Sequence, residues 1–317
     1  MKKSLITAAL SLLTIISPGQ GKQTDISIVF WNLENFFDFV DGGTSDSDAE
    51  FSAAGARRWS KRRFYAKCGC IAKTLFYISD EAGGMPDIVC FAEVENAFVL
   101  RSLLSTTNLK KYDYETVHYD SPDPRGIDVA LLYRKDRLEA LETAPAAIPG
   151  VVTRDILYAG LRTPEGDSLA VLVNHHPSKF GGKAADPRRR AAVRRMASLA
   201  DSLSAAGWSS IVSLGDFNDT PDSDIYEPLE GRCINLSAPA AARGEGTIRF
   251  NGRWELIDQC FVSPGLAAKA DFRICRIPFL TTRDSAHSGE KPLRTYQGPR
   301  YLGGASDHYP ILVHIRM

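Results

Sequence analysis

The stretch GGASDHYPILVHIRM, residues 303–317, places two ionisable side chains, Asp307 and His308, directly before a run of apolar residues. Residues 311–315 of this run have the length and composition of a buried β-strand. An acid and a histidine at the entrance of such a strand have two explanations. They belong either to a polar loop that leads into a core strand or to a catalytic site. The other apolar stretches of the chain distinguish between the two.

Polar side chains recur where these apolar stretches end. The stretches read IVFW, DIVCFA, RGIDVALL, AVLVN, IVSLG and ELIDQCFV, and the polar residues within or after them are Asn32, Glu93, Asp128, His175, His176, Asp216, Asn218 and Asp258. If the strands end at one edge of a sheet, these side chains converge on one cleft. Each residue alone has a structural explanation, such as an Asx turn in GDFND. A lone buried carboxylate is costly, however, and we interpret the whole set as a site.

Stretches typical of strands outnumber those typical of helices. Apolar residues have helical spacing over residues 62–80 and again over residues 185–206, where Pro187 lies near the predicted helix start. Residues 41–58 are rich in Gly, Ser, Asp and Ala and predict a long exposed loop. We find no internal repeat or interdomain linker. The pattern predicts one α/β domain of two packed sheets with helices outside.

The chain begins MKKSLITAALSLLTIISPGQGKQ, in which two lysines precede about a dozen apolar residues. This is the layout of a secretory signal peptide, and the run is shorter than the roughly 20 residues of a membrane span. We therefore expect residues 1–21 to be a signal peptide and residues 22–317 to form a single domain. The protein is expected to be exported, to the periplasm or the extracellular medium.

The formal net charge is +0, which excludes a strongly basic surface over the whole chain but not a local basic patch. Of the six cysteines, Cys90 and Cys260 lie in apolar strand-like stretches and are predicted to be core thiols. Cys68 and Cys70 lack a second pair at zinc-site spacing, so a zinc site is not predicted.

The polar set indicates metal-assisted hydrolysis of a phosphoester. Carboxylate and amide oxygens are hard ligands, suited to Mg²⁺ or Ca²⁺ rather than to zinc. A histidine held by a carboxylate can act as a general base or can stabilise negative charge. Arginine and asparagine side chains can hold the extra negative charge of the transition state.

The stretches WNLEN, FAEVEN, RGIDVALLYR, NHHPS, GDFND, LIDQCFVS and SDHYP together resemble the endonuclease/exonuclease/phosphatase superfamily. That superfamily includes deoxyribonuclease I, exonuclease III, neutral sphingomyelinases and inositol polyphosphate 5-phosphatases. The resemblance runs from Asp25 to Ile315, and the stretches NLENFFD and HPSKFGG are similar to a secreted bacterial subgroup. It implies a four-layer α/β sandwich, in which two mixed β-sheets pack face to face with helices on the outside.

The resemblance also implies a metal centre. Glu93 matches the main ligand of a Mg²⁺ ion, and Asn32 and Asp307 match residues at the same centre. Mn²⁺ and Ca²⁺ are possible substitutes for Mg²⁺. Arg125 is expected to contact a substrate phosphate.

Further roles follow from the same resemblance. His308 matches the histidine that activates water or binds the scissile phosphate, and Asp258 matches the aspartate that orients it. Asp216 and Asn218 match the pair that positions the nucleophile and stabilises the transition state. His175 matches a candidate acid toward the leaving oxygen, and His175 and Asn218 are also expected to contact the substrate phosphate.

Several positions keep more than one interpretation. His176 is the alternative to His175, and we favour His175 because it directly follows the apolar stretch LVN. Glu34 and Glu95 flank motif residues without a predicted role. Asp128 is either the partner of a histidine or a structural acid.

The leading functional hypothesis is a secreted, Mg²⁺-dependent phosphodiesterase that acts as an endonuclease on DNA. We expect a monomer, with nucleic acid as the substrate and without a protein partner. Basic residues near the motifs support the nuclease interpretation, namely Lys179, Lys183, Arg243, Arg249 and Arg253.

Two alternatives differ in substrate or in kind. The first is a phosphatase or a sphingomyelinase-like phospholipase C, acting on small phosphoesters or lipids. A lipid enzyme is expected to have an exposed apolar loop, and residues 41–59 offer only Phe51 and Trp59. The second is a binding protein of the same fold without catalysis, against which the intact polar positions argue.

Overall fold

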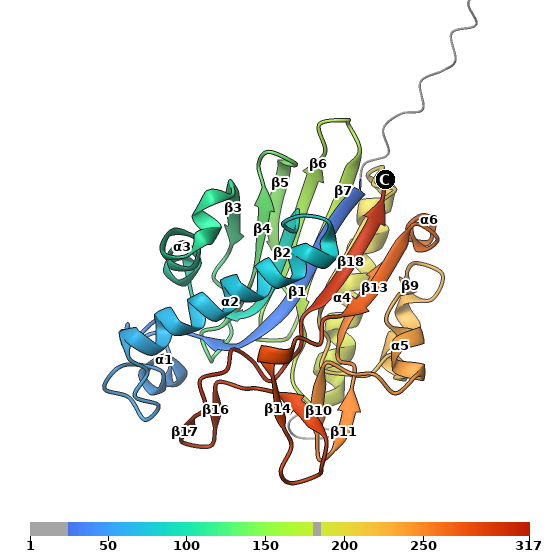
Figure 1. Ribbon diagram of the computed structural model, residues 1–317. Coiled ribbons are helices and arrows are strands. Elements are labelled where there is room, and N and C mark those ends of the chain that lie inside the picture. Colours follow the sequence, from blue (N-terminus) through green and yellow to red (C-terminus); the bar gives the residue numbers. More distant parts are fainter. Residues whose placement is uncertain (1–24, 180–184) are drawn as a thin grey trace, which may run out of the picture.

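The computed structural model describes residues 25–179 and 185–317 (Figure 1). The predicted signal peptide, residues 1–21, and Lys183 lie outside the described residues. Within the described ranges, no helix has the length and apolar character needed to span a membrane.

Two six-stranded sheets form the framework. The first sheet has the order β13-β18-β1-β2-β4-β3 and the second has the order β5-β6-β7-β8-β12-β9. In each sheet one central pair is parallel, β1 with β2 and β7 with β8, and the other pairs are antiparallel. Both sheets are therefore mixed.

The strands of the two sheets have the following bounds. The first sheet contains β1 (Asp25–Phe36), β2 (Ile88–Val94), β3 (Tyr114–His118), β4 (Asp128–Arg134), β13 (Ala270–Ile274) and β18 (Ile311–Arg316). The second contains β5 (Glu139–Ala146), β6 (Ile156–Arg162), β7 (Ser168–His175), β8 (Ile211–Asp216), β9 (Ile234–Asn235) and β12 (Asp258–Val262).

Helices and small hairpins complete the structure. The helices are α1 (Asp46–Glu50), α2 (Lys61–Ala82), α3 (Ala97–Thr106), α4 (Asp186–Ala205), α5 (Ala238–Ala242) and α6 (Pro264–Ala267), with short 3-10 turns η1 (Asn108–Lys111), η3 (Asp224–Leu229) and η4 (Pro278–Leu280). Three hairpins pair β10 (Ile248–Phe250) with β11 (Arg253–Glu255), β14 (Thr281–Arg283) with β15 (Glu290–Pro292), and β16 (Tyr296–Gln297) with β17 (Arg300–Tyr301).

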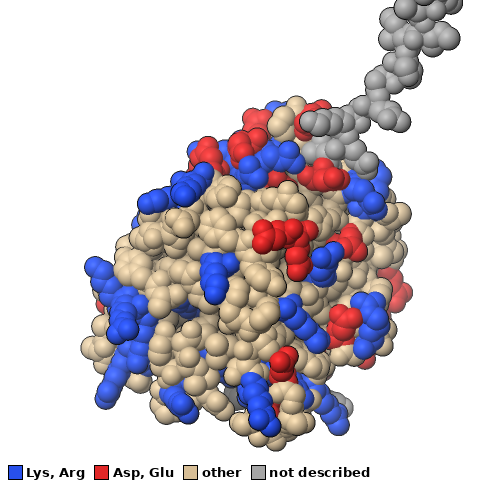
Figure 2. Space-filling model, viewed as in Figure 1, with Lys and Arg blue, Asp and Glu red and all other residues tan. Residues whose placement is uncertain are grey.

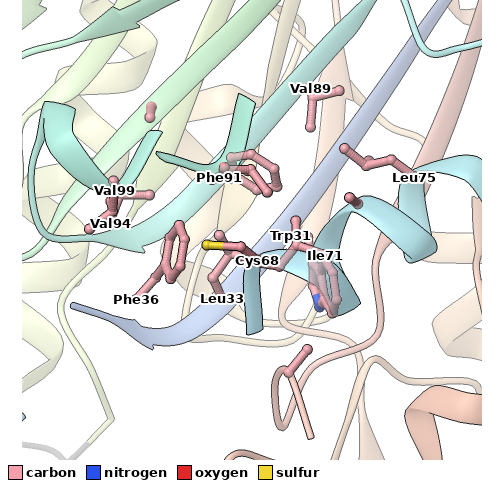
Figure 3. Close-up of a cluster of buried hydrophobic side chains, with 14 of the residues drawn as sticks. Trp31, Leu33, Phe36, Cys68, Ile71, Leu75, Val89, Phe91, Val94 and Val99 are labelled. Atoms are coloured by element: carbon pink, nitrogen blue, oxygen red, sulfur yellow. The ribbon is translucent and has the colours of Figure 1, made fainter. Parts of the chain in front are cut away.

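Alternation along β1 separates two apolar layers. Ile28 points toward the second sheet and packs with residues of β7 and β8, whereas Val29 faces the opposite way. The outward layer is covered by α2 and α3, and Figure 3 shows Cys68 and Ile71 of α2 lying against Trp31 of β1. Burial of this apolar stripe, not intrinsic propensity, supplies most of the stability of such helices.

Helix α4 packs on the outer face of the second sheet and closes a third apolar cluster. Val193 and Met196 of α4 contact Leu172 of β7 within one buried cluster. The order of layers is therefore helix, sheet, sheet, helix, with α2 in front of the first sheet and α4 behind the second (Figure 1). This arrangement confirms the predicted four-layer α/β sandwich.

The prediction of a long exposed loop at residues 41–58 is wrong in part. The segment contains α1, and Phe51 is buried against Phe37 with ring centroids 5.2 Å apart. Trp59, just beyond it, is fully buried and donates its indole N–H to the Phe37 carbonyl at 2.9 Å. Both aromatic side chains therefore belong to the core and cannot contact a lipid surface. The polar composition of the segment concealed this anchoring.

All six cysteines are free thiols. Cys90 and Cys260 are fully buried between the two sheets, which confirms their prediction as core thiols.

Candidate active site

The second sheet contributes one row of polar side chains to the site. His175 at the end of β7 lies opposite Asp216 at the end of β8, and Asp216 lies opposite Asp258 at the start of β12. The register of three neighbouring strands therefore aligns these residues side by side. All three are buried, as expected where two sheets close over a site.

The first sheet contributes Asn32 and Glu93. Asn32 of β1 pairs with Ala92 of β2, and Glu93 follows in a bulge with a φ of +61°. A positive φ is unfavourable for a residue with a side chain, and such strain is characteristic of functional sites. The Asn32 amide Nδ2 donates to Asp216 Oδ2 at 2.9 Å, so one hydrogen bond joins the two sheets at the site.

His308 lies in the loop before β18 and is held from several directions. Its Nδ1 is 2.7 Å from Asp258 Oδ2. Its backbone carbonyl accepts the indole N–H of Trp31 at 2.9 Å, and its backbone N–H donates to the Ser306 hydroxyl at 3.0 Å. The Thr247 hydroxyl also donates to Asp258 Oδ2. These contacts hold the ring in one orientation, with Nε2 3.9 Å from Asp216 Oδ2 and 3.8 Å from Asp307 Oδ1.

The pKa values of Asp216 and His308 are both raised, but for different reasons. Burial, reinforced by the neighbouring Asp258 carboxylate, raises the pKa of Asp216 to about 7. Burial opposes protonation of His308, but Asp258 and Asp216 outweigh it and raise the pKa of His308 well above its usual range. His308 Nε2 lies 3.9 Å from Asp216 Oδ2. The two carboxylates therefore favour the protonated form of His308, and burial makes Asp216 a weaker acid than an exposed aspartate.

The three predicted metal ligands offer only oxygen donors. Glu93 Oε2 accepts the Asn35 backbone N–H at 2.7 Å, whereas Oε1 accepts no hydrogen bond from the described residues. Asn32 Oδ1 accepts the Glu34 N–H at 2.9 Å and retains a second lone pair. Asp307 is partly exposed at the cleft. This donor set fits a hard divalent cation such as Mg²⁺.

Two arginines accompany these carboxylates. Arg125 Nη2 lies 3.3 Å from Glu93 Oε2, and Arg294 Nη2 lies 3.0 Å from Asp307 Oδ2. Burial alone would raise the pKa of Glu93, but the Arg125 charge and the Asn35 N–H together lower it. Glu93 is therefore ionised, as a metal ligand must be. Arg125 was predicted at the site, whereas Arg294 was not.

The two neighbouring histidines have different environments. His175 Nε2 lies 3.7 Å from Asp216 Oδ2, within the polar row. His176 instead packs its ring against Phe217, with centroids 4.7 Å apart, and Nε2 lies 3.3 Å from Asn174 Oδ1. The geometry therefore places His175 at the site and His176 in the core.

His175 is neutral in this environment. Burial, followed by the positive charges of Arg154 and Arg125, lowers the pKa of His175 well below its usual range. Its Nδ1 is buried and has no hydrogen-bond partner among the described residues. A neutral imidazole with an unpaired ring nitrogen can give or accept one hydrogen bond when substrate binds.

Asn218 and Arg154 form the wall beside His175. The Asn218 backbone N–H donates to Asp216 Oδ1 at 2.9 Å, and its side-chain Nδ2 donates to the His176 carbonyl at 3.0 Å. Arg154 is buried, and its Nη2 donates to the same carbonyl at 2.7 Å. Sequence reasoning missed Arg154 because VVTRD carries no motif.

Glu34, Glu95 and Asp128 each have hydrogen-bond partners within the protein. Glu34 Oε1 accepts a hydrogen bond from Arg294 Nε at 2.9 Å. Glu95 Oε2 accepts the backbone N–H of Asp38, in the loop after β1, at 2.6 Å. Asp128 Oδ2 lies 3.2 Å from His118 Nε2, outside the polar row, so Asp128 partners a histidine of β3.

Solved structures share this fold at low sequence identity. A Bacteroides thetaiotaomicron endonuclease/exonuclease/phosphatase family protein superposes with a TM-score of 0.60 at 17% identity, covering 93% of this chain and 99% of that one. The human Nocturnin catalytic domain gives a TM-score of 0.58 at 15% identity, covering 95% and 100%. A mannosyl-6-phosphatase from Bacteroides thetaiotaomicron gives 0.60 at 16% identity, covering 91% and 98%. At these identities the likeness establishes the fold.

By sequence, no curated protein matches the chain. A family model does match, over residues 27–317, which is nearly the whole described structure. Both sheets and every residue of the polar row fall inside that match. The chain belongs to the Endonuclease/Exonuclease/phosphatase family, whose members are phosphoester hydrolases that generally depend on a divalent metal.

Proposed function

We propose that the protein is a Mg²⁺-dependent phosphodiesterase that hydrolyses DNA as an endonuclease. The observation that carries the proposal is the buried contact of His308 with Asp258 and Asp216, beside the carboxylate of Glu93. Four ionisable groups with shifted or paired charges in one cleft are costly unless they serve chemistry. In this family the chemistry is phosphoester hydrolysis.

Each residue of the site is assigned one role in the in-line attack of water on the phosphate. Asp216, with a pKa near 7, is placed to accept the proton of the attacking water. Its two oxygens are held by Asn32 and by the Asn218 backbone N–H, so the carboxylate cannot rotate away. His308 directs Nε2 toward the phosphate, and Asp258 keeps the ring in that orientation.

The remaining groups stabilise charge on the phosphate and on the leaving oxygen. His175 and the Asn218 amide lie at the end of the row. Both are assigned to the substrate phosphate, and His175 is also assigned to the leaving oxygen. Arg125, partly exposed beside Glu93, is assigned to the incoming phosphate. Glu93, Asp307 and Asn32 would hold the divalent ion, with Mn²⁺ or Ca²⁺ as substitutes. That ion would neutralise the charge that develops on the phosphoryl oxygens.

Purified residues 22–317 test this proposal directly. Supercoiled plasmid, bis-p-nitrophenyl phosphate and p-nitrophenyl phosphate are assayed with Mg²⁺ and with EDTA. We expect plasmid nicking and diester cleavage that disappear with EDTA and in His308→Ala. The matched control is His314→Ala, which changes a histidine of β18 away from the polar row. Cleavage that persists in His308→Ala would refute the assignment of the site.

A phosphatase acting on small phosphoesters is the second candidate. It is favoured by the likeness to a mannosyl-6-phosphatase, at a TM-score of 0.60, and by the balanced net charge of +0. Preferential hydrolysis of mannose 6-phosphate or p-nitrophenyl phosphate over both diesters would select it. The lipid alternative loses support because Phe51 and Trp59 are buried.

We further propose that the mature protein is one exported domain, residues 22–317, acting as a monomer. The two sheets share a single buried layer, which supports one folding unit. Cell fractionation with N-terminal sequencing tests the export, and gel filtration tests the monomer. A product that retains residues 1–21 in the cytoplasm would contradict the proposal.

A further inference from the structure

A basic pocket lies near the catalytic cluster, by which we mean Asp216, Asp258 and His308. None of the roles assigned above involves this pocket. Its volume is about 610 Å³, and it opens between the β10–β11 hairpin and the segment around β14 and β15. Its lining includes Arg249, Arg276, Arg283, Trp254, Tyr309 and a single acidic residue, Glu290. A pocket with an excess of arginines is suited to an anion.

Backbone and side-chain contacts connect the pocket to the catalytic cluster. Tyr309 lines the pocket and directly follows His308 in the chain. The Tyr309 backbone N–H donates to the Thr247 carbonyl at 2.9 Å, and the Thr247 hydroxyl in turn donates to Asp258. These contacts connect the wall of the pocket to the loop that holds His308 and to the hydrogen-bond partner of Asp258.

The arginines of the pocket are not equivalent. Arg249 is committed to the protein, because its guanidinium donates to the carbonyls of Gly252 and Glu290. Within the described ranges, the side chains of Arg276 and Arg283 have neither a carboxylate partner within 4 Å nor a hydrogen bond. Figure 2 shows basic side chains along the lower edge of the molecule, where Figure 1 places these hairpins.

Arg276 is held in place by aromatic stacking. Its guanidinium carbon lies 4.5 Å from the centre of the Trp254 ring, and Trp254 stacks on Tyr309 with centroids 5.8 Å apart. Stacking restrains a guanidinium while leaving its N–H edges free for a phosphate. Arg276 is exposed to solvent, and the stacking gives its guanidinium a preferred position at the pocket.

The β10–β11 hairpin adds an exposed aromatic side chain. Asn251 and Gly252 at its turn have φ values of +47° and +78°, as in the tight turns that build rigid hairpins. Phe250 precedes the turn and is 64% exposed, opposite Arg253 across the hairpin. An exposed ring on a rigid arm is suited to stacking on a nucleic acid base.

We propose that this pocket binds the phosphate next to the scissile one in a nucleic acid strand, while Phe250 stacks on a base of that strand. The inference rests on the proposed function and narrows its substrate to a chain of at least two phosphodiesters. Arg276 and Arg283 are the phosphate contacts. The negative charge of Glu290 opposes the binding of a phosphate at these two arginines.

Direct binding without turnover tests the proposal. Fluorescence anisotropy of a labelled single-stranded 12-nucleotide DNA is measured with EDTA present, over a range of salt concentrations. We expect Arg276→Gln and Arg283→Gln each to weaken binding and to lower the slope of log Kd against log salt by about 0.7. Glu290→Gln should tighten binding. Phe250→Ala should weaken it about tenfold with an unchanged salt slope.

The matched control is Arg162→Gln. Arg162 pairs with Ser168 at the start of β7, whereas the site lies at the end of that strand. If both pocket variants bind the DNA as Arg162→Gln does, or if the wild-type protein does not bind it, the inference is refuted. If they instead weaken only the binding of inositol hexakisphosphate, the pocket serves a small polyphosphate and the nucleic acid assignment fails.

These outcomes are separable from failure of the proposed function. Hydrolysis of bis-p-nitrophenyl phosphate by the wild-type protein requires the catalytic cluster but has no neighbouring phosphate to fill the pocket. Diester cleavage combined with unchanged DNA binding in the pocket variants would therefore leave the proposed chemistry intact and remove only the inference.

Discussion

Two ion pairs of nearly equal length allow the effect of burial on an arginine–carboxylate pair to be measured. Arg154 Nη1 lies 2.8 Å from Asp123 Oδ2, with the side chains 7% and 3% exposed. Arg162 Nη2 lies 2.7 Å from Glu139 Oε2, with the side chains 46% and 65% exposed. Asp123→Ala leaves a guanidinium buried without a carboxylate, which costs about 3–5 kcal/mol. Glu139→Ala should cost about 0–1 kcal/mol.

Chemical denaturation of single and double variants gives the assay. The two cycles combine Asp123→Ala with Arg154→Met and Glu139→Ala with Arg162→Met. We expect a coupling energy above about 2 kcal/mol for the buried pair and below about 1 kcal/mol for the exposed pair. Removing both buried partners should cost less than removing Asp123 alone, because no unpaired charge then remains. Equal coupling in the two cycles would refute the reasoning from burial.

Three further predictions concern Asp258, the core histidine His176 and the proposed metal ligand Glu93. Asp258→Asn should lower kcat by about 10²–10⁴-fold with an unchanged fold, because His308 loses the group that orients it, and steady-state assays with circular dichroism check this. Burial, with Arg154 and Arg189 nearby, lowers the pKa of His176 to about 3, so the unfolded chain takes up a proton below about pH 6.5 that the folded chain excludes. His176 should therefore contribute a fall of about 1.4 kcal/mol per pH unit to the free energy of unfolding as pH drops from 6 to 4, and the difference between wild type and His176→Gln should show that slope. Mg²⁺ at 100 times its Kd should raise the free energy of unfolding by about 2.7 kcal/mol, and a melting temperature of Glu93→Gln that still rises with Mg²⁺ would remove Glu93 from the metal centre.

The sequence indicates the polar row and Glu93 because each of these residues adjoins an apolar strand. Strand ends are local features, so Asp216 in IVSLGDFND and Glu93 in DIVCFAEVEN are recognisable without any partner. The network behind the metal ligands has no such local sign. Arg294 binds Glu34 across 260 positions of the chain, and nothing in KPLRTYQ indicates that contact.

The basic residues show the same limit. Lys179 and Arg243 were predicted to support nucleic acid binding, but Glu255 holds the first at 3.2 Å and Glu245 holds the second at 2.7 Å. Arg276 carries no motif, yet it has a free guanidinium in the described structure because its neighbour is Trp254 rather than an acid. An arginine without a carboxylate partner keeps its full charge for a ligand, and whether such a partner lies nearby depends on the tertiary fold.

The close approach of β7 and β8 explains why the row is compact. A Cβ atom at Gly215 would lie 2.1 Å from the Asn174 carbonyl oxygen, so only glycine permits the two strands to meet at this point. The next residues along each strand are His175 and Asp216, which the same register sets opposite each other. Asp216 in turn meets Asn32 from the other sheet. The proposed chemistry therefore requires the glycine of the GDFND motif, because only glycine lets β7 and β8 approach closely enough to bring His175 and Asp216 together.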